Sequence, residues 1–211
     1  MVQKLNLPND SLILFQPNPD GAEAFQGLEE IFERIAAGLY SLAVMLVGEG
    51  EESVQLVENA ISTAKVSPCA DPHEAQKSCR QALSTAALDL LVQRDSTSLA
   101  APEWLVPASS CIEGDDLASA GISTEELVEM IGGKDRDRVR QWLASLSSWM
   151  RTVFVLRAVA GFSAMETAAM LKKHGGQEAG AWTADAVREV FRQGLCSLAS
   201  QLLHASAEQA L

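Results

Sequence analysis

The sequence has few of the residues that build β-sheets. Only 5% of its 211 residues are aromatic, whereas alanine and leucine are abundant. Strands favour aromatic and β-branched residues, while Ala and Leu favour helices, so this composition predicts an all-helical fold. The length is sufficient for one large domain or two small ones.

Long apolar runs are also missing. The longest, from Ala36 to Gly48, is shorter than the roughly 18 residues that a membrane span needs. The segment from Met1 to Leu14 has one lysine and no long apolar core, unlike a secretory signal. We therefore expect a cytoplasmic protein without a membrane partner.

Cysteine and histidine are sparse and scattered. Cys69, Cys79, Cys111 and Cys196 are widely spaced without a CxxC pair, and the three histidines lie far apart in the sequence. This spacing predicts reduced thiols of a cytosolic protein and no metal site.

Motifs of catalysis are absent as well. The chain has no Walker loop and no GxSxG, HExxH or GxGxxG motif. We expect no catalytic residue, no cofactor and no enzyme activity.

Charge is unevenly distributed along the chain. The net charge is −12, which argues against a general nucleic-acid binder. Residues 1–133 hold 21 acidic and 6 basic residues, whereas residues 134–211 hold 7 acidic and 10 basic residues. An acidic front half and a mildly basic back half indicate two domains with different partners.

The pattern of apolar residues and helix-breaking residues predicts four segments. These are a lead-in over residues 1–21, a helical domain over 22–95, a linker over 96–121 and a second helical domain over 122–211. Helical periodicity and end signals predict eight helices, over residues 22–47, 51–65, 72–94, 123–132, 135–146, 148–160, 163–173 and 183–204.

The most informative segment runs from residue 149 to residue 171. It predicts a helix that stops at Gly161 and another that begins after Ser163, with Glu166 three residues beyond this N-cap. Such a Ser and Glu form a capping box, and Ser123 with Glu126 repeats the pattern. A short glycine-bearing turn between helices is typical of a helix-turn-helix.

This segment resembles region four, the promoter-reading domain, of bacterial sigma factors of the extracytoplasmic-function type. That domain has an apolar helix ending in Arg, a turn of Gly, an aromatic residue or Leu, and Ser, and then a Glu-x-Ala-x-x-Leu helix. The matching residues are Arg151, Val153, Phe154, Leu156, Arg157, Gly161, Ser163, Glu166, Ala168 and Leu171.

The front half resembles region two of the same family. Residues 39–48 are similar to its start, residues 48–61 to its acidic polymerase-binding helix, and the run from Asp89 to Arg94 to the end of its promoter-melting helix. The resemblance implies a sigma-factor-like transcription initiation protein with two small helical domains joined by a linker. Its implied partners are core RNA polymerase and promoter DNA, and an anti-sigma protein is a third candidate.

The resemblance also assigns contacts with the polymerase. It places them at Glu51, Glu52, Gln55 and Glu58. The family usually has an acid pair followed by Gln-Glu, where this chain has Val54-Gln55 and then Glu58-Asn59.

Promoter contacts are expected from the helix over residues 183–195. Arg188 and Arg192 lie four residues apart on one face of this helix. They would contact phosphate or guanine in the major groove, with a merely solvated face as the alternative.

Three further cations are candidates for DNA contacts. Lys172 and Lys173 would add phosphate contacts, although a helix C-terminus favours cations on dipole grounds alone. Arg94 ends the melting-like helix, but Asp95 follows it where the family has several arginines.

Other departures from the family favour a second hypothesis. Residues 172–182 lengthen the turn before the recognition helix, Glu189 and Val190 replace a Ser and an Arg, and Asp185 and Glu189 would face phosphates unfavourably. With a net charge of −12, DNA binding would be weak unless the polymerase tethers the chain. The alternative is a degenerate sigma-like protein that acts as a protein-binding regulator without DNA readout.

Overall fold

The computed structural model describes residues 35–64, 72–97, 99–102 and 111–208, and the side chains as far as residue 202. The chain divides into two compact units, Met1–Ile35 and Ala36–Leu211. Everything below concerns the second unit. The part of the expected first helix that precedes residue 35 lies outside the described residues.

Every regular element in the described ranges is helical, as the composition predicts. A first helix covers residues 35–47. The others are α2 (Glu51–Thr63), α3 (Pro72–Arg94), η1 (Leu117–Ala120), α4 (Thr124–Gly132), α5 (Arg136–Ser145), α6 (Ser148–Phe154), η2 (Val155–Val159), α7 (Ala164–His174), η3 (Gln177–Ala181) and α8 (Ala184–Glu208).

The predicted helix ends agree closely with the observed ones where local signals fix them. Both capping boxes form, because Ser123 and Ser163 each accept the backbone N–H of the Glu three residues later and each Glu side chain accepts in return. One expected helix is interrupted, because Val155–Val159 winds as a π-turn between α6 and Gly161.

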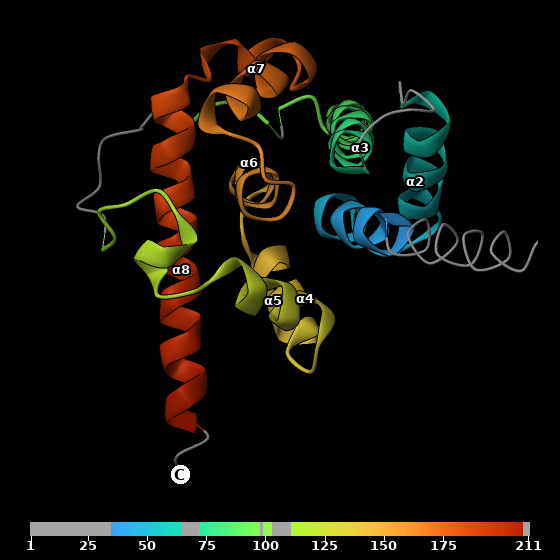
Figure 1. Ribbon diagram of the computed structural model, residues 1–211. Helices are drawn as coiled ribbons and strands as arrows, with labels where there is room; N and C mark the ends of the chain where they lie inside the picture. The colour runs from blue at the N-terminus through green and yellow to red at the C-terminus, as the bar shows by residue number, and fades with distance from the viewer. Residues whose placement is uncertain (1–34, 65–71, 98, 103–110, 209–211) are drawn as a thin grey trace, which may run out of the picture. The chain divides into compact units, whose positions relative to one another are not determined.

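The front helices bury one leucine-rich core. α2 packs against α3 (Figure 1), and the helix of residues 35–47 contributes an apolar face. The fully buried side chains include Leu39, Leu42, Leu46, Leu83 and Leu88. Burial of this kind contributes roughly 1.5–3 kcal/mol for each such side chain.

The back half is organised around α8, which packs against α6, α7 and η1 (Figure 1). Phe154 of α6 lies 4.9 Å from the ring centre of Trp142, edge to face, and 5.5 Å from that of Phe191. Gly194 of α8 faces this cluster, and a Cβ there would lie 3.0 Å from Phe154 Cδ2. Glycine in a helix costs about 1 kcal/mol relative to alanine. The close approach of Phe154 explains why a glycine stands at position 194.

The stretched turn between α7 and α8 is folded around a buried tryptophan. η3 leads into Trp182, whose side chain is fully buried and whose Nε1 donates a hydrogen bond to the Leu99 carbonyl at 2.8 Å. Gly176, with φ 85°, lies against Val92 and the Ser96 carbonyl. The turn thus docks onto the chain that leaves α3.

The indole of Trp182 gives a direct test of this docking. We expect Trp182→Ala to lower the free energy of unfolding by about 3–5 kcal/mol, because a large buried side chain is removed. Trp182→Phe retains most apolar contacts but leaves the Leu99 carbonyl unpaired, at a cost of about 1–3 kcal/mol. Denaturant unfolding followed by circular dichroism measures both values.

Met165→Ala is the matched control, since this large apolar side chain is 71% exposed. Its effect should stay within about 0.5 kcal/mol. A Trp182→Ala variant as stable as this control would show that the indole does not hold the turn in place.

Candidate nucleic-acid interface

The helix pair α7 and α8 is built by strong local signals. Gly161, with φ 78°, reverses the chain after the π-turn, and Ser163 then caps α7. The Ser163 N–H donates to Glu166 Oε2 at 2.8 Å, and the Glu166 N–H donates to Ser163 Oγ at 3.2 Å. α8 follows Trp182, and the Thr183 hydroxyl accepts the Ala186 N–H at 3.1 Å.

Both arginines of the expected recognition helix are held by acids of their own helix. Arg188 Nη1 lies 2.5 Å from the Asp185 carboxylate, and Arg192 Nη2 lies 2.6 Å from the Glu189 carboxylate. The Arg192–Glu189 pair is largely buried, whereas Asp185 is 92% exposed. Both pairs neutralise much of the positive charge that a phosphate would meet.

The linker supplies further acceptors to the same arginines. The Asp115 carboxylate lies 3.6 Å from Arg188 Nε, and the Glu113 carbonyl accepts from Arg192 Nη1 at 3.4 Å. Pairing of these arginines with the linker was not expected from the sequence. No local pattern in residues 96–121 indicates which helix they contact.

Asp115 is anchored through a third arginine. Arg157 of the π-turn donates through Nη2 to the Asp115 carbonyl at 3.0 Å and to its carboxylate at 3.3 Å. Arg157 also donates to the Phe162 carbonyl at 3.0 Å, and its guanidinium carbon lies 5.0 Å from the centre of the Phe191 ring. Its side chain is only 16% exposed, so the anchor is largely shielded from water.

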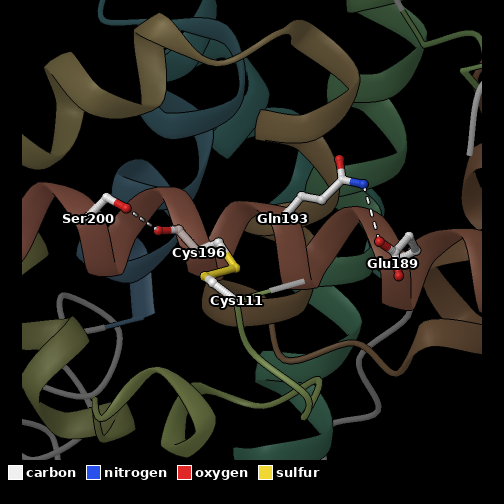
Figure 2. The surroundings of a disulfide bond; sticks show 5 residues. All are labelled: Cys111, Glu189, Gln193, Cys196 and Ser200. Atoms are coloured by element: carbon white, nitrogen blue, oxygen red, sulfur yellow. Dashed lines mark hydrogen bonds between the residues drawn. A yellow bond between two sulfur atoms is a disulfide. The ribbon is translucent and has the colours of Figure 1, made fainter. Parts of the chain in front are cut away.

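The expectation for Glu189 was wrong. Glu189 does not face outward toward a phosphate, because it is 7% exposed and accepts a hydrogen bond from Arg192. It also accepts one from Gln193, which Figure 2 shows. The guanidinium of Arg192 compensates part of the cost of burying this carboxylate. Asp185, in contrast, is exposed on the first turn of α8, as expected.

The expectation of reduced thiols was wrong for two cysteines. Cys111 in the linker and Cys196 of α8 form a disulfide, with their Cα atoms 5.9 Å apart (Figure 2). The two residues are 85 positions apart in the sequence, so spacing alone could not pair them. Cys79 is a buried free thiol, and burial raises its pKa.

The remaining candidate cations lie in different settings. Lys172 and Lys173 are exposed in the last turn of α7. Arg94, at the end of α3, instead donates to the Val47 carbonyl at 3.0 Å and forms an ion pair with Glu52. Arg94, an expected DNA contact, and Glu52, an expected polymerase contact, therefore pair with each other.

The outer face of α2 carries the other expected site. Glu51, Glu52, Gln55 and Glu58 are all exposed, and Gln55 Nε2 donates to the Glu51 carboxylate at 3.3 Å. Two apolar side chains that the sequence did not single out as contacts lie on the same helix: Val54 is 44% exposed and Ile61 is 48% exposed. They are seven residues apart, so they share one helix face, which combines acidic and apolar groups.

Polar contacts connect α3 to α7. Lys77 Nζ lies 3.1 Å from the Glu166 carboxylate, and His174 Nδ1 lies 3.0 Å from the Asp89 carboxylate. The backbone and hydroxyl bonds from Ser163, with a smaller contribution from Lys77, hold the pKa of Glu166 down to about 2. The capping box of α7 is therefore also a contact with α3.

Other kinds of site find little support in the described ranges. No group of three or more His, Cys, Asp or Glu side chains there could hold a metal ion. Among the same residues, no helix is long and apolar enough to cross a membrane.

Comparison with protein-family models, with curated protein sequences and with solved structures finds no match to this chain.

The depressed pKa of Glu166 predicts an acid-sensitive contribution to stability. Its folded-state pKa of about 2 lies below the unfolded value of about 4.3. The contribution is complete at neutral pH and is lost as the pH falls from about 5 to about 2. We expect Glu166→Gln to flatten this part of the stability–pH curve, measured by urea unfolding at a series of pH values.

Glu58→Gln removes one exposed negative charge from α2 and serves as the control. It should leave the shape of the curve unchanged. Parallel curves for wild type and Glu166→Gln would show that the capping carboxylate is not linked to folding.

Proposed function

We propose that this chain is a sigma-factor-like transcription initiation protein that binds core RNA polymerase through α2 and promoter DNA through α8. The observation that carries the proposal is the helix pair α7–α8, in which a capped helix precedes the helix with Arg188 and Arg192. The proposal also rests on the sequence resemblance of residues 39–61, 89–94 and 149–171 to the sigma-factor family. The two-domain organisation with a linker over residues 96–121 is part of the same proposal.

The surface of α2 supports the polymerase half of the proposal. Glu51 and Glu58 lie close to the face of α2 that carries Val54 and Ile61, and interfaces combine an apolar centre with a polar rim. Exposed apolar side chains on one face of a helix, such as Val54 and Ile61 two turns apart, are a typical feature of a helix that docks onto another protein.

The ion pairs of α8 determine how strongly DNA would bind. Asp185, Glu189 and the linker acceptors compete with phosphate for Arg188 and Arg192. Affinity of the isolated chain for DNA would therefore be low. Tethering by the polymerase raises the effective DNA concentration and offsets this competition.

The same pairing of both arginines favours a second candidate function. In a degenerate sigma-like protein, α8 would serve only to build the fold, and α2 would bind the polymerase or an anti-sigma partner without DNA readout. Neither function requires a cofactor or catalysis.

The α2 surface can be tested with a single charge introduced into its apolar part. We expect Ile61→Glu to weaken binding to purified bacterial core RNA polymerase by at least about tenfold, because it places a charge in the interface core. Biolayer interferometry at near-physiological salt measures the dissociation constant. Val128→Glu, at another exposed apolar position (63% exposed), is the control and should bind like wild type.

The DNA half is tested with the same polymerase and a random-sequence duplex library. We expect the wild-type complex to retain a selected set of sequences, and Arg188→Glu to abolish this selection because it reverses the charge at the groove. Arg138→Glu, which alters another exposed, acid-paired arginine on α5, is the matched control.

The outcomes separate the two candidate functions. Polymerase binding with sequence selection that depends on Arg188 supports the initiation protein. Polymerase binding without selection supports the regulator. Absence of polymerase binding overturns the first proposal.

A further inference from the structure

The disulfide lies at the point where the linker crosses the candidate DNA-reading helix. Cys111 begins a short segment, residues 111–116, that we call the strap, and Cys196 lies on α8 (Figure 2). η1 follows the strap and packs against the same helix. The covalent bond thus holds an acidic linker segment against α8.

The strap places acceptors on the two arginines expected to meet DNA. The Glu113 carbonyl accepts from Arg192 at 3.4 Å, and the Asp115 carboxylate lies 3.6 Å from Arg188 Nε. Both distances are long, so these contacts alone are weak. Their persistence depends on how closely the strap is confined to α8.

Besides the burial of Ile112 and the packing of η1 against α8, two specific attachments confine it. On one side of Glu113 is the disulfide, and on the other is Asp115, bound to the largely buried Arg157. Attachment at two points makes the strap an intramolecular competitor at high effective concentration. Loss of the disulfide removes one point and leaves the other.

We propose that Cys111–Cys196 is a thiol–disulfide exchange site that controls access to Arg188 and Arg192. This inference rests on the proposed function, and it adds redox regulation of the same helix. In the closed state the strap contacts both arginines, whose side chains are 44% and 30% exposed. In the open state phosphates take its place.

The reaction balances with a dithiol reductant of the thioredoxin or dithiothreitol class. Its thiolate attacks the sulfur of Cys111, which is the more exposed residue of the pair, and the S–S bond breaks as Cys196 leaves as a thiolate. The second thiol of the reductant then displaces Cys111. The protein gains two electrons and two protons, and the reductant becomes a disulfide.

The expected cellular setting supports a switch rather than a permanent staple. In a reducing cytosol, disulfides are rare, and those that form are usually transient or redox-sensing. Transcription takes place in that compartment in bacteria. An oxidant would close the strap there, and thiol reductants would open it again.

Access to the arginines can be measured without DNA. Oxidised and reduced full-length chain are labelled with phenylglyoxal, and modification at each arginine is read by peptide mass spectrometry. We expect reduction to raise labelling of Arg188 and Arg192 by severalfold, with Arg138 as the internal reference. Unchanged labelling of both arginines overturns the proposal, whatever the DNA assay shows.

Cysteine variants provide the matched controls. Cys111→Ser and Cys196→Ser should label like the reduced wild type under oxidising conditions, whereas Cys79→Ser should keep the redox response. Circular dichroism establishes that each variant is folded. Asp115→Asn weakens the second attachment and should raise labelling of Arg188 even in the oxidised protein, so the test does not depend on cysteine variants alone.

A second assay measures DNA retention by the complex with core polymerase. Reduction should increase retention of the random-sequence library about tenfold or more, as expected for removal of an intramolecular competitor. If labelling responds to reduction but neither redox state retains DNA, the proposed DNA function fails while the exchange site stands. If DNA is retained equally in both states, redox control of DNA binding is overturned.

Discussion

The burial of Trp182 is the constraint on which the arrangement of the back half depends. Its indole fills the space between η3 and the chain leaving α3, and its N–H satisfies the Leu99 carbonyl. Because Trp182 immediately precedes the first turn of α8, this contact fixes where that helix begins. The side of α8 on which Arg188 and Arg192 lie depends on where the helix begins. The lengthened turn between α7 and α8 is therefore packed into the fold through Trp182.

Local physics made much of this fold predictable. The two Ser–Glu capping boxes, the end of α3 at Arg94 and the helical composition depend on residues a few positions apart, and each agrees with the structure. The burial of Trp182 and the pairing of Arg157 with Asp115 depend on contacts between residues distant in the sequence. No periodicity encodes such contacts, so they were not predicted.

The candidate site was predictable in its residues but not in their surroundings. Arg188 and Arg192 do lie on one helix, yet the acceptors that hold them come from the linker as well as from α8. Glu189 appeared unfavourable for DNA when considered as an exposed acid. In the structure it is buried and accepts a hydrogen bond from Arg192. A charge on a helix can thus be assigned a role only once its burial is known.

The closed disulfide has a topological consequence. It joins residues 85 positions apart, so the polypeptide from Cys111 to Cys196 forms a covalent ring that contains α4 to α7 and half of α8, with α2 and α3 outside it. Closing a ring of this size lowers the conformational entropy of the unfolded chain. In the chain-entropy model this destabilises the unfolded state by about 4–5 kcal/mol. A protease that cuts inside the ring would leave its two products covalently linked. Under mechanical force the ring would transmit tension through its sulfur bridge, so the helices within it would be shielded from the pull while the front helices unravel.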